Sequence, residues 1–456
     1  MRYLTSTVFF SICLASHSFG QLTELERLTE IQNELDQTQE SLFELESDYG
    51  RLDRRLLEPL DQVSASLIEN ERFSDAHTVL DQAIQIIRVS EGLYSSTQFP
   101  LVIRNIENKV LQGDWTDAKE LMQHLSWLIG RGENEVNEEL VTTILDLIDI
   151  HLWGVVDDLE SNQSFHFKRA ERLTNFVNTI ARHSYVEGDS RVTAIMYKKV
   201  VQMYLQSIAV EVGGPTGISL RSFSSIGYAI SRGDAQDSLY YAGIRSLGSI
   251  RDFYLRSDTP NLEGAGIALM YRGDWEILFG KNLEAQQAYE RGHELLLESG
   301  QTQEAINRFT SQPKMLPLLD FYATLDSAAA LDSDSIAAAE SDSSISNFTF
   351  RQWSSQFPKA SAPIRRGLQE FNQRDGEYAM FSFNLVGMDR ANRWYRGRYK
   401  RNISSPQNLE LVRQQISSSV DMVELAESIK DFHYRPKFIN GEPQTVNATL
   451  VFQLAD

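Results

Sequence analysis

The sequence predicts an α-helical solenoid followed by a small α+β domain with the element order β-β-α-β. Three observations support this prediction. A six-residue phrase recurs within residues 21–323, the composition changes over residues 324–350, and an alternating apolar pattern follows an Asn-Gly pair within residues 351–456. Recurring phrases are typical of solenoids, because each repeat buries its apolar face against its neighbours, while strict alternation is the period of a β-strand.

The first 20 residues have the features of a secretory signal peptide. Arg2 precedes an apolar run at 8–15, and Ser18 and Gly20 occupy the small-residue places before Gln21. We therefore expect export and cleavage after Gly20. The apolar run is shorter than the roughly 20 residues that span a bilayer, so an uncleaved anchor is the less favoured alternative.

Composition argues against several classes of protein. Cys13 is the only cysteine, so the processed chain has no disulfide and no cysteine metal site. Residues 351–456 carry a net charge of +4 and the preceding 350 residues carry −24. This balance argues against bulk nucleic-acid binding. It also suggests either two units under different selective pressures or two units that attract each other. Metal-ligand spacings, phosphate loops and nucleophile elbows are not found, so we expect no metal, no cofactor and no catalysis.

A heptad-like stripe of large apolar residues predicts one long helix near the N-terminus. The helix is expected to pack on the next helices of the same chain, with dimerisation as the alternative. The residues seven apart are Leu28, Leu35, Leu42, Tyr49 and Leu56.

The recurring phrase reads ERFSDA at 71–76, GDWTDA at 113–118, GDAQDS at 233–238 and GKNLEA at 280–285. A Gly or polar residue ends one helix, an acidic residue begins the next, and a small sixth residue lets the two helices approach. The phrase resembles the tetratricopeptide repeat, in which a Gly, an Ala five residues on and a large apolar residue four beyond that recur. The resemblance implies helical hairpins over 21–323 whose groove binds a partner's helix or extended peptide.

The segment 324–350 is predicted to be a flexible acidic linker. Its first 23 residues hold four Asp and one Glu among Ser and Ala, with no Lys or Arg. Such a composition buries too little apolar surface to order the chain, although a transient Ala-rich helix is possible.

Four elements are expected after the linker. Residues 376–386 form a strand with one apolar face, residues 392–401 form a second strand, and residues 421–432 form a helix. Asn440-Gly441 makes a hairpin turn, because both residue types tolerate positive φ, and a terminal strand follows. The apolar face of the first strand consists of Ala379, Phe381, Phe383 and Leu385.

The end of the chain also resembles the C-terminal domain of TonB-family proteins. That family's signature has an aromatic residue, a basic residue and Pro, then an N-G-x-P turn and a terminal strand. The matching residues are Tyr434, Arg435, Pro436, Asn440, Gly441 and Pro443, and FPKA at 357–360 is close to the family's opening phrase. The resemblance covers residues 351–456 and implies a periplasmic partner-binding module. The second strand departs from the family pattern, which leaves its register open.

Two segments are candidate partner-binding sites. If the terminal strand lies at the sheet edge, its free N–H and C=O groups can accept an extended segment, as the resemblance to TonB relatives also implies; a purely structural strand is the alternative. The expected residues are Val446, Asn447, Ala448, Thr449, Leu450, Val451 and Phe452.

The second candidate is the basic and aromatic stretch at 390–401. As a strand it would place Arg396 and Arg398 on one face, where they could bind a phosphate-bearing lipid, nucleic acid or an acidic protein. A solvated face, or one docked on the acidic repeats, is the favoured alternative.

The combined prediction is a periplasmic envelope adaptor that binds protein partners, such as an outer-membrane receptor or an extended peptide, without a cofactor or nucleic acid. One alternative is a TonB-type energy transducer with an uncleaved anchor. Another is an envelope enzyme whose site is not recognised.

Overall fold

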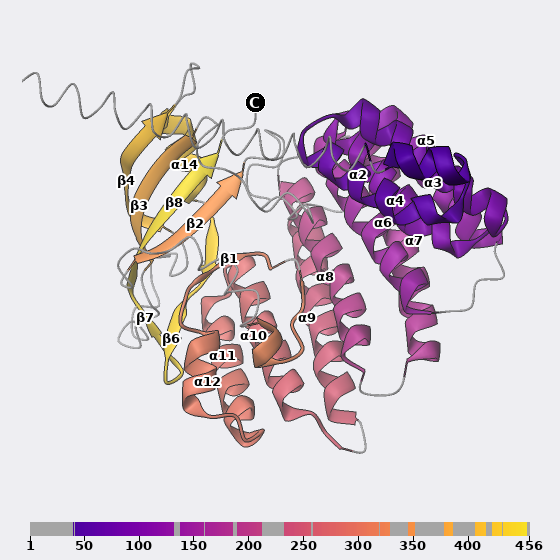
Figure 1. The fold of residues 1–456 in the computed structure, drawn as a ribbon. Helices are drawn as coiled ribbons and strands as arrows, with labels where there is room; N and C mark the ends of the chain where they lie inside the picture. Colours follow the sequence, from indigo (N-terminus) through magenta and orange to yellow (C-terminus); the bar gives the residue numbers. More distant parts are fainter. Residues whose placement is uncertain are drawn as a thin grey trace, which may run out of the picture. The chain divides into compact units, whose positions relative to one another are not determined.

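The computed structural model describes residues 40, 42–131, 137–158, 160–185, 189–211, 232–256, 259–318, 320–328, 345–351, 378–385, 406–415, 422–430 and 432–453. Within these ranges the chain is mainly α-helical with a small C-terminal sheet region, as the sequence predicts (Figure 1). It divides into two compact units, Met1–Asp146 and Leu147–Asp456. The predicted signal peptide and the basic stretch at 390–401 lie outside the described residues.

The first unit consists of the helices α2 (Leu57–Glu69), α3 (Phe73–Ser90), α4 (Phe99–Leu111), α5 (Trp115–Arg131) and the beginning of α6 (Glu138–Asp157). Along the series from α2 to α5, each helix packs on the next one. A short 3-10 turn, η1 (Arg54–Leu56), comes directly before the first of them, and a second, η2 (Ser96–Gln98), lies between α3 and α4.

The predicted single helix through the heptad stripe is wrong. Residues 42–49 are helical, but Gly50 has a φ of +85° and ends the helix. Tyr49, which belongs to the stripe, is 45% exposed, and Leu52, three residues further on, is 52% exposed. The seven-residue spacing of apolar residues therefore continues beyond Gly50, although the helix ends at that glycine.

The second unit begins within α6 and contains a further series of helices. They are α7 (Glu160–Ser184), α8 (Ser190–Glu211), α9 (Arg232–Arg256), α10 (Leu262–Leu278), α11 (Asn282–Glu298) and α12 (Gln303–Phe309). Helix α10 is central, because it packs against α9, α11 and strand β5 (His433–Arg435). Gly266 of α10 and Gly292 of α11 let these two helices approach: a Cβ on Gly292 would lie 2.9 Å from the Gly266 carbonyl oxygen.

Three of the four recurring phrases have the same backbone geometry. Glu71, Gly113 and Gly280 have φ values of +57°, +76° and +68°, and a helix begins two residues after each. The next amide donates back to the preceding helix, as Lys281 N does to Glu276 O at 2.8 Å. The sixth residue is fully buried in all three: Ala76, Ala118 and Ala285. The fourth phrase differs, because Gly233 lies inside α9.

A fifth occurrence, which the sequence analysis missed, lies at 300–305. Gly300 has a φ of +89° and α12 begins at Gln303. The sequence GQTQEA has the same spacing from Gly300 to Ala305, and Phe309 four residues further on is buried. The spacing of Gly, Ala and a large apolar residue would have identified it.

The main sheet has four strands in the order β2-β8-β3-β4. The strands are β2 (Ile345–Arg351), β3 (Tyr378–Leu385), β4 (Pro406–Gln415) and β8 (Val446–Gln453), and α14 (Met422–Lys430) packs on β4. The predicted first strand, helix and terminal strand are therefore confirmed. The predicted apolar face of β3 is also confirmed, because its four residues are at most 4% exposed. The predicted second strand at 392–401 lies outside the described residues. Strand β3 pairs with β8 on one side and with β4 on the other.

The Asn-Gly turn is confirmed. Asn440 and Gly441 have φ values of +52° and +77° and join β6 (Lys437–Ile439) to β7 (Glu442–Gln444). Positive φ at both central residues is the geometry that suits a tight hairpin.

The predicted linker differs from the structure at both ends. Leu325 and Ala328 are buried, and Leu325 N donates to Glu263 Oε1 at 2.8 Å. Residues 345–351 form β2. The remaining linker residues lie outside the described ranges.

The C-terminal strands belong to the same compact unit as α7 to α12, rather than to a separate unit. Strand β5 pairs with β1 (Lys314–Leu316), which follows α12. Phe438 N donates to Thr310 O at 3.0 Å, and Asn440 N donates to Asn307 Oδ1 at 2.8 Å. The hairpin is thus hydrogen-bonded to the helical region that precedes it.

Replacing Gly292 by Ala should lower the free energy of unfolding by about 1–3 kcal/mol, because the new Cβ would press on the Gly266 carbonyl oxygen. Gly248→Ala, in α9, is the control: no atom lies within 4 Å of its new Cβ, so it should raise the stability by up to about 1 kcal/mol. Denaturant unfolding measures both, and equal effects would contradict the close approach of α10 and α11.

Candidate functional site

A buried ion pair joins β5 to α10. Arg435 is 1% exposed and Asp274 is 4% exposed. The Arg435 Nε donates to Asp274 Oδ1 at 2.8 Å, and its Nη2 donates to the other carboxylate oxygen. Burial lowers the pKa of Arg435, but the charge of Asp274 and its hydrogen bonds outweigh this effect, so the pKa lies above its ordinary value. The guanidinium therefore stays charged within the core, and it meets the Asp274 side chain in the bidentate geometry that suits an Arg–carboxylate pair.

Aromatic side chains complete the surroundings of this ion pair. The Tyr289 hydroxyl donates to Asp274 Oδ1 at 2.8 Å. The rings of Tyr271 and Phe309 have their centroids 5.3 Å and 5.4 Å from the guanidinium carbon of Arg435. Burial raises the pKa of both Tyr271 and Tyr289 well above the ordinary value, so their hydroxyls stay protonated.

The alternation of strand β5 explains why Tyr434 and Arg435 reach different cores. Successive strand residues point to opposite sides. Tyr434 packs in the core of the sheet, where its ring lies 5.7 Å from that of Phe383. Arg435 contacts α10 instead. The aromatic-basic-Pro signature thus serves here to connect the sheet to the helices.

Asp274 was not identified from the sequence. It lies in a helix whose residues from Gly264 to Ile277 are almost all buried. An acidic residue in a helix that is apolar on every side indicates a buried cationic partner, and this signal could have identified it.

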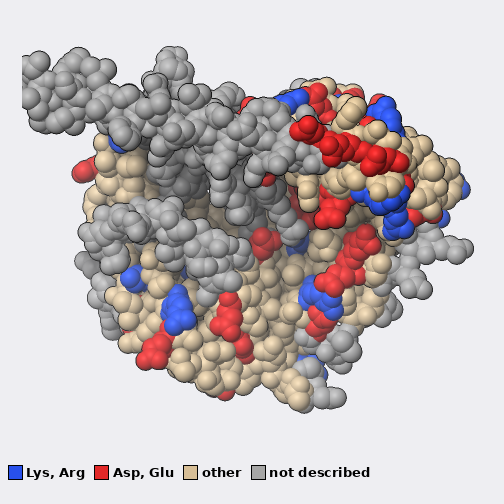
Figure 2. Space-filling model, in the orientation of Figure 1, with Lys and Arg blue, Asp and Glu red and all other residues tan. Residues whose placement is uncertain are grey.

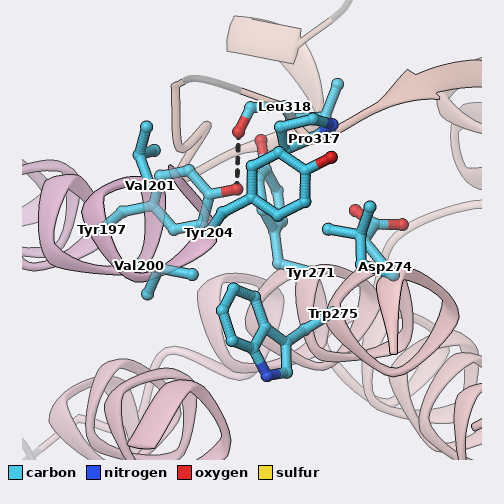
Figure 3. Close-up of a pocket in the computed structure, with 10 residues that line it drawn as sticks. Tyr197, Val200, Val201, Tyr204, Tyr271, Asp274, Trp275, Pro317 and Leu318 are labelled. Atoms are coloured by element: carbon cyan, nitrogen blue, oxygen red, sulfur yellow. Dashed lines mark hydrogen bonds between the residues drawn. The ribbon is translucent and has the colours of Figure 1, made fainter. Parts of the chain in front are cut away.

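Beside this ion pair lies a small cavity with a volume of about 10 Å³, which is room for roughly one water molecule. Figure 3 shows the rings of Tyr197, Tyr204 and Tyr271 gathered around it. The Tyr197 hydroxyl donates to the Leu318 carbonyl at 2.7 Å. Ligand pockets are usually hundreds of Å³ in volume, so this cavity does not suit a small-molecule substrate.

The predicted open edge at Val446–Phe452 is not present. Strand β8 pairs antiparallel with β3, and it pairs parallel with β2 from Ile345↔Asn447 to Arg351↔Gln453. Both backbone edges of β8 are therefore occupied. The prediction was wrong on this point because the segment that forms β2 was assigned to the linker. Arg396 and Arg398, the other predicted binding residues, lie outside the described residues.

Strand β4 forms an edge of the sheet. Among the described strands it pairs with β3 alone. Leu411 and Val412 are 45% and 59% exposed. Asn408 has a φ of +54°, and the pairing with β3 contains two register shifts. Irregularities of this kind limit uncontrolled edge pairing, while the apolar side chains remain accessible.

A second buried polar cluster consists of His151, Asp158 and His166. His166 Nε2 lies 2.9 Å from Asp158 Oδ2, and the Nδ1 atoms of the two histidines are 3.0 Å apart. If His166 Nε2–H donates to the carboxylate, then His166 Nδ1 accepts a hydrogen bond from His151 Nδ1–H. Gly154 makes room for the cluster, because a Cβ there would lie 2.6 Å from His166 Nδ1. The sequence analysis considered the histidines scattered, since these three residues are spread over two helices and their connection.

Both signs of charge occur on the face of the described part of the chain that Figure 2 draws. Figure 2 shows acidic and basic side chains beside one another on the face drawn. Exposed ion pairs occur on the described surface, for example between Arg291 Nη1 and Glu294 Oε2 at 2.8 Å. Within the described ranges, no group of His, Cys, Asp or Glu is arranged to hold a metal ion, and no helix is long and apolar enough to cross a membrane.

Comparison with models of known protein families gives no match, and a search of curated protein sequences gives none either.

Replacing Arg435 by Met should lower the free energy of unfolding by about 3–5 kcal/mol, because Asp274 would remain buried without its cation. Adding Asp274→Asn to that variant should recover part of the loss, since a neutral amide is less costly to bury. Arg291→Met, on the exposed side of α11, should cause no measurable change in denaturant unfolding. An effect of Arg435→Met no larger than that of the control would contradict a charged, paired Arg435.

The stability of the protein should fall as the pH drops below 6.5. Burial lowers the pKa of His151 well below its ordinary value of 6.5. His151 therefore takes up a proton more readily in the unfolded chain than in the folded chain. Its contribution to the free energy of unfolding is fully present above the unfolded-state pKa of about 6.5 and is lost as the pH falls below that value. His151→Gln should reduce the slope of unfolding free energy between pH 7 and pH 5 by up to about 1.4 kcal/mol per pH unit. His293→Gln, at a partly exposed histidine of α11, should reduce it less; equal slopes in all three proteins would contradict the assignment.

Proposed function

We propose that the chain is an exported adaptor of the cell envelope that binds protein partners through its helices and its C-terminal sheet. The signal-like N-terminus and the resemblance to TonB-family C-terminal domains support export to the periplasm. The observation that carries the proposal is the β4 edge, an extended segment with exposed apolar side chains.

The β4 edge suits the addition of a partner's strand. Its pairing with β3 fixes one row of backbone groups, and the other row faces away from β3. Backbone hydrogen bonds would supply affinity, while Leu411 and Val412 would supply apolar contacts. The proposed strand-binding site is thus β4, which pairs with β3 on the side opposite β8, the strand that the sequence analysis favoured.

The sheet is held firmly enough to act as a docking platform. Strand β5, whose Tyr434 side chain packs in the sheet core, is joined to α10 by the buried Arg435–Asp274 pair. The β6–β7 hairpin that follows contacts α11 and α12. A partner bound at β4 is therefore positioned relative to these helices, rather than carried on an independent module.

The helices contribute a second kind of surface. Three phrases share one backbone geometry, and α2 to α5 and α7 to α12 pack in chain order. Both features support the interpretation as tetratricopeptide-like repeats. In the first unit, Tyr94 and Trp127 are 49% and 45% exposed with ring centroids 5.6 Å apart. Exposed aromatic pairs are enriched where proteins bind one another.

Val412→Lys should reduce the recovery of partner proteins from envelope extracts by about tenfold, because a lysine at a strand edge opposes strand addition. The affinity-tagged, exported chain is the bait. Leu283→Lys on α11 is the matched control, since Leu283 is 57% exposed and Val412 is 59% exposed. A photoreactive residue at position 412 should form discrete adducts with the same partners. Equal recovery by both lysine variants, without adducts at position 412, would exclude β4 as the binding edge.

A further inference from the structure

We propose that Asn440, in the turn of the β6–β7 hairpin, is a site of spontaneous deamidation, and that Asn307 of α12 limits the rate of this reaction. The modification replaces the side-chain amide of Asn440 by a carboxylate. This inference goes beyond the adaptor role, because it involves no partner and concerns the hairpin that is hydrogen-bonded to the helices.

The chemistry follows from the residue types in the turn. Asn440 and Gly441 are the only Asn-Gly pair in the sequence. The backbone nitrogen of Gly441 attacks the side-chain carbonyl carbon of Asn440, Cγ, and glycine has no side chain to obstruct the approach. The new bond joins Gly441 N to Asn440 Cγ, the Cγ–Nδ2 bond breaks, and ammonia leaves with the proton of the glycine nitrogen. Water then opens the cyclic imide to aspartate or isoaspartate, and it reaches Asn440 because this residue is exposed.

The first support is a reciprocal pair of hydrogen bonds between Asn440 and Asn307. Asn307 Nδ2 donates to Asn440 Oδ1 at 2.9 Å, and Asn440 N donates to Asn307 Oδ1 at 2.8 Å. Ring closure turns the Asn440 side chain toward the Gly441 nitrogen, which breaks the bond that Oδ1 accepts. Asn307 therefore slows the reaction by stabilising the unreacted conformation.

The second support is that the surroundings of the turn are fixed on both sides. Gln303 Nε2 donates to Asn307 Oδ1 at 3.0 Å, which sets the orientation of the Asn307 amide. Gly441 packs on α11, where a Cβ added to it would lie 3.1 Å from His293 Nδ1. Closure of the ring therefore requires the turn to move relative to both α11 and α12.

Deamidation at this position would weaken the attachment of the hairpin. Isoaspartate lengthens the backbone, which does not fit a two-residue turn whose length sets the pairing of β6 with β7. The hydrogen bond from the backbone nitrogen of residue 440 to Asn307 is then lost. The bond from Phe438 N to Thr310 O comes before the turn and is retained.

Mass spectrometry of the purified full-length chain, incubated at mildly alkaline pH, tests the proposal. The fragment that contains position 440 is compared with a free peptide of residues 437–444 under the same conditions. Conversion in the folded chain should be at least about tenfold slower than in the peptide, because two hydrogen bonds of ordinary strength have to open first. Asn307→Ala should recover most of that factor. Arg308→Ala, at the next residue of α12, which is exposed, is the matched control and should leave the rate unchanged.

Gln303→Ala is a second variant, which retains Asn307 but removes the bond that orients it. Its conversion rate should lie between those of the unaltered chain and Asn307→Ala, and it decides the question if denaturant unfolding shows that Asn307→Ala does not fold. The isoaspartate form, separated by chromatography, should unfold at a lower denaturant concentration than the unaltered chain. The proposal is overturned if the folded chain reacts as fast as the peptide, if no folded variant reacts faster than Arg308→Ala, or if the isoaspartate form is as stable as the unaltered chain.

Discussion

The attachment of the C-terminal strands to the helices of the second unit depends on the buried ion pair between Arg435 on β5 and Asp274 on α10. Removing two charges from water is costly, and the cost is offset only if the geometry satisfies both groups. Here two guanidinium hydrogen bonds and the Tyr289 hydroxyl satisfy the carboxylate. A shift of β5 along α10 would leave both charges buried and unpaired. The ion pair therefore fixes one arrangement of the strand on the helix more strictly than apolar packing would.

Strand β5 belongs to two cores at once. Its Tyr434 side chain is part of the sheet core, while the next residue reaches the interior of the helical region. The β1–β5 pairing and the hairpin contact at Thr310 reinforce the same junction. For this reason the C-terminal strands and the helices α7 to α12 form one compact unit, although their composition and charge differ.

Local patterns in the sequence predicted those elements whose structure depends on neighbouring residues. Alternation identified β3 and β8, the Asn440-Gly441 pair identified the hairpin turn, and the recurring phrase identified three helix starts. Long-range pairing was not visible in the same way. The segment ISNFTFR follows a polar stretch and does not alternate strictly, so its role as β2 depends on β8, about a hundred residues later. Asp274 and Arg435 are 161 residues apart, and nothing in their spacing indicates that they meet.

The order of the paired elements along the chain has a consequence for biosynthesis. Strand β8 lies between β2 and β3 in space but follows both in sequence, and Arg435 arrives long after Asp274. At ordinary elongation speeds of about 5–20 residues per second, the nascent chain carries the Asp274 carboxylate without its counterion for on the order of ten seconds or more. During that interval the earlier strands have no β8 to join. Strand β8 and Arg435 therefore join the fold late, which favours completion of the fold after synthesis rather than during it.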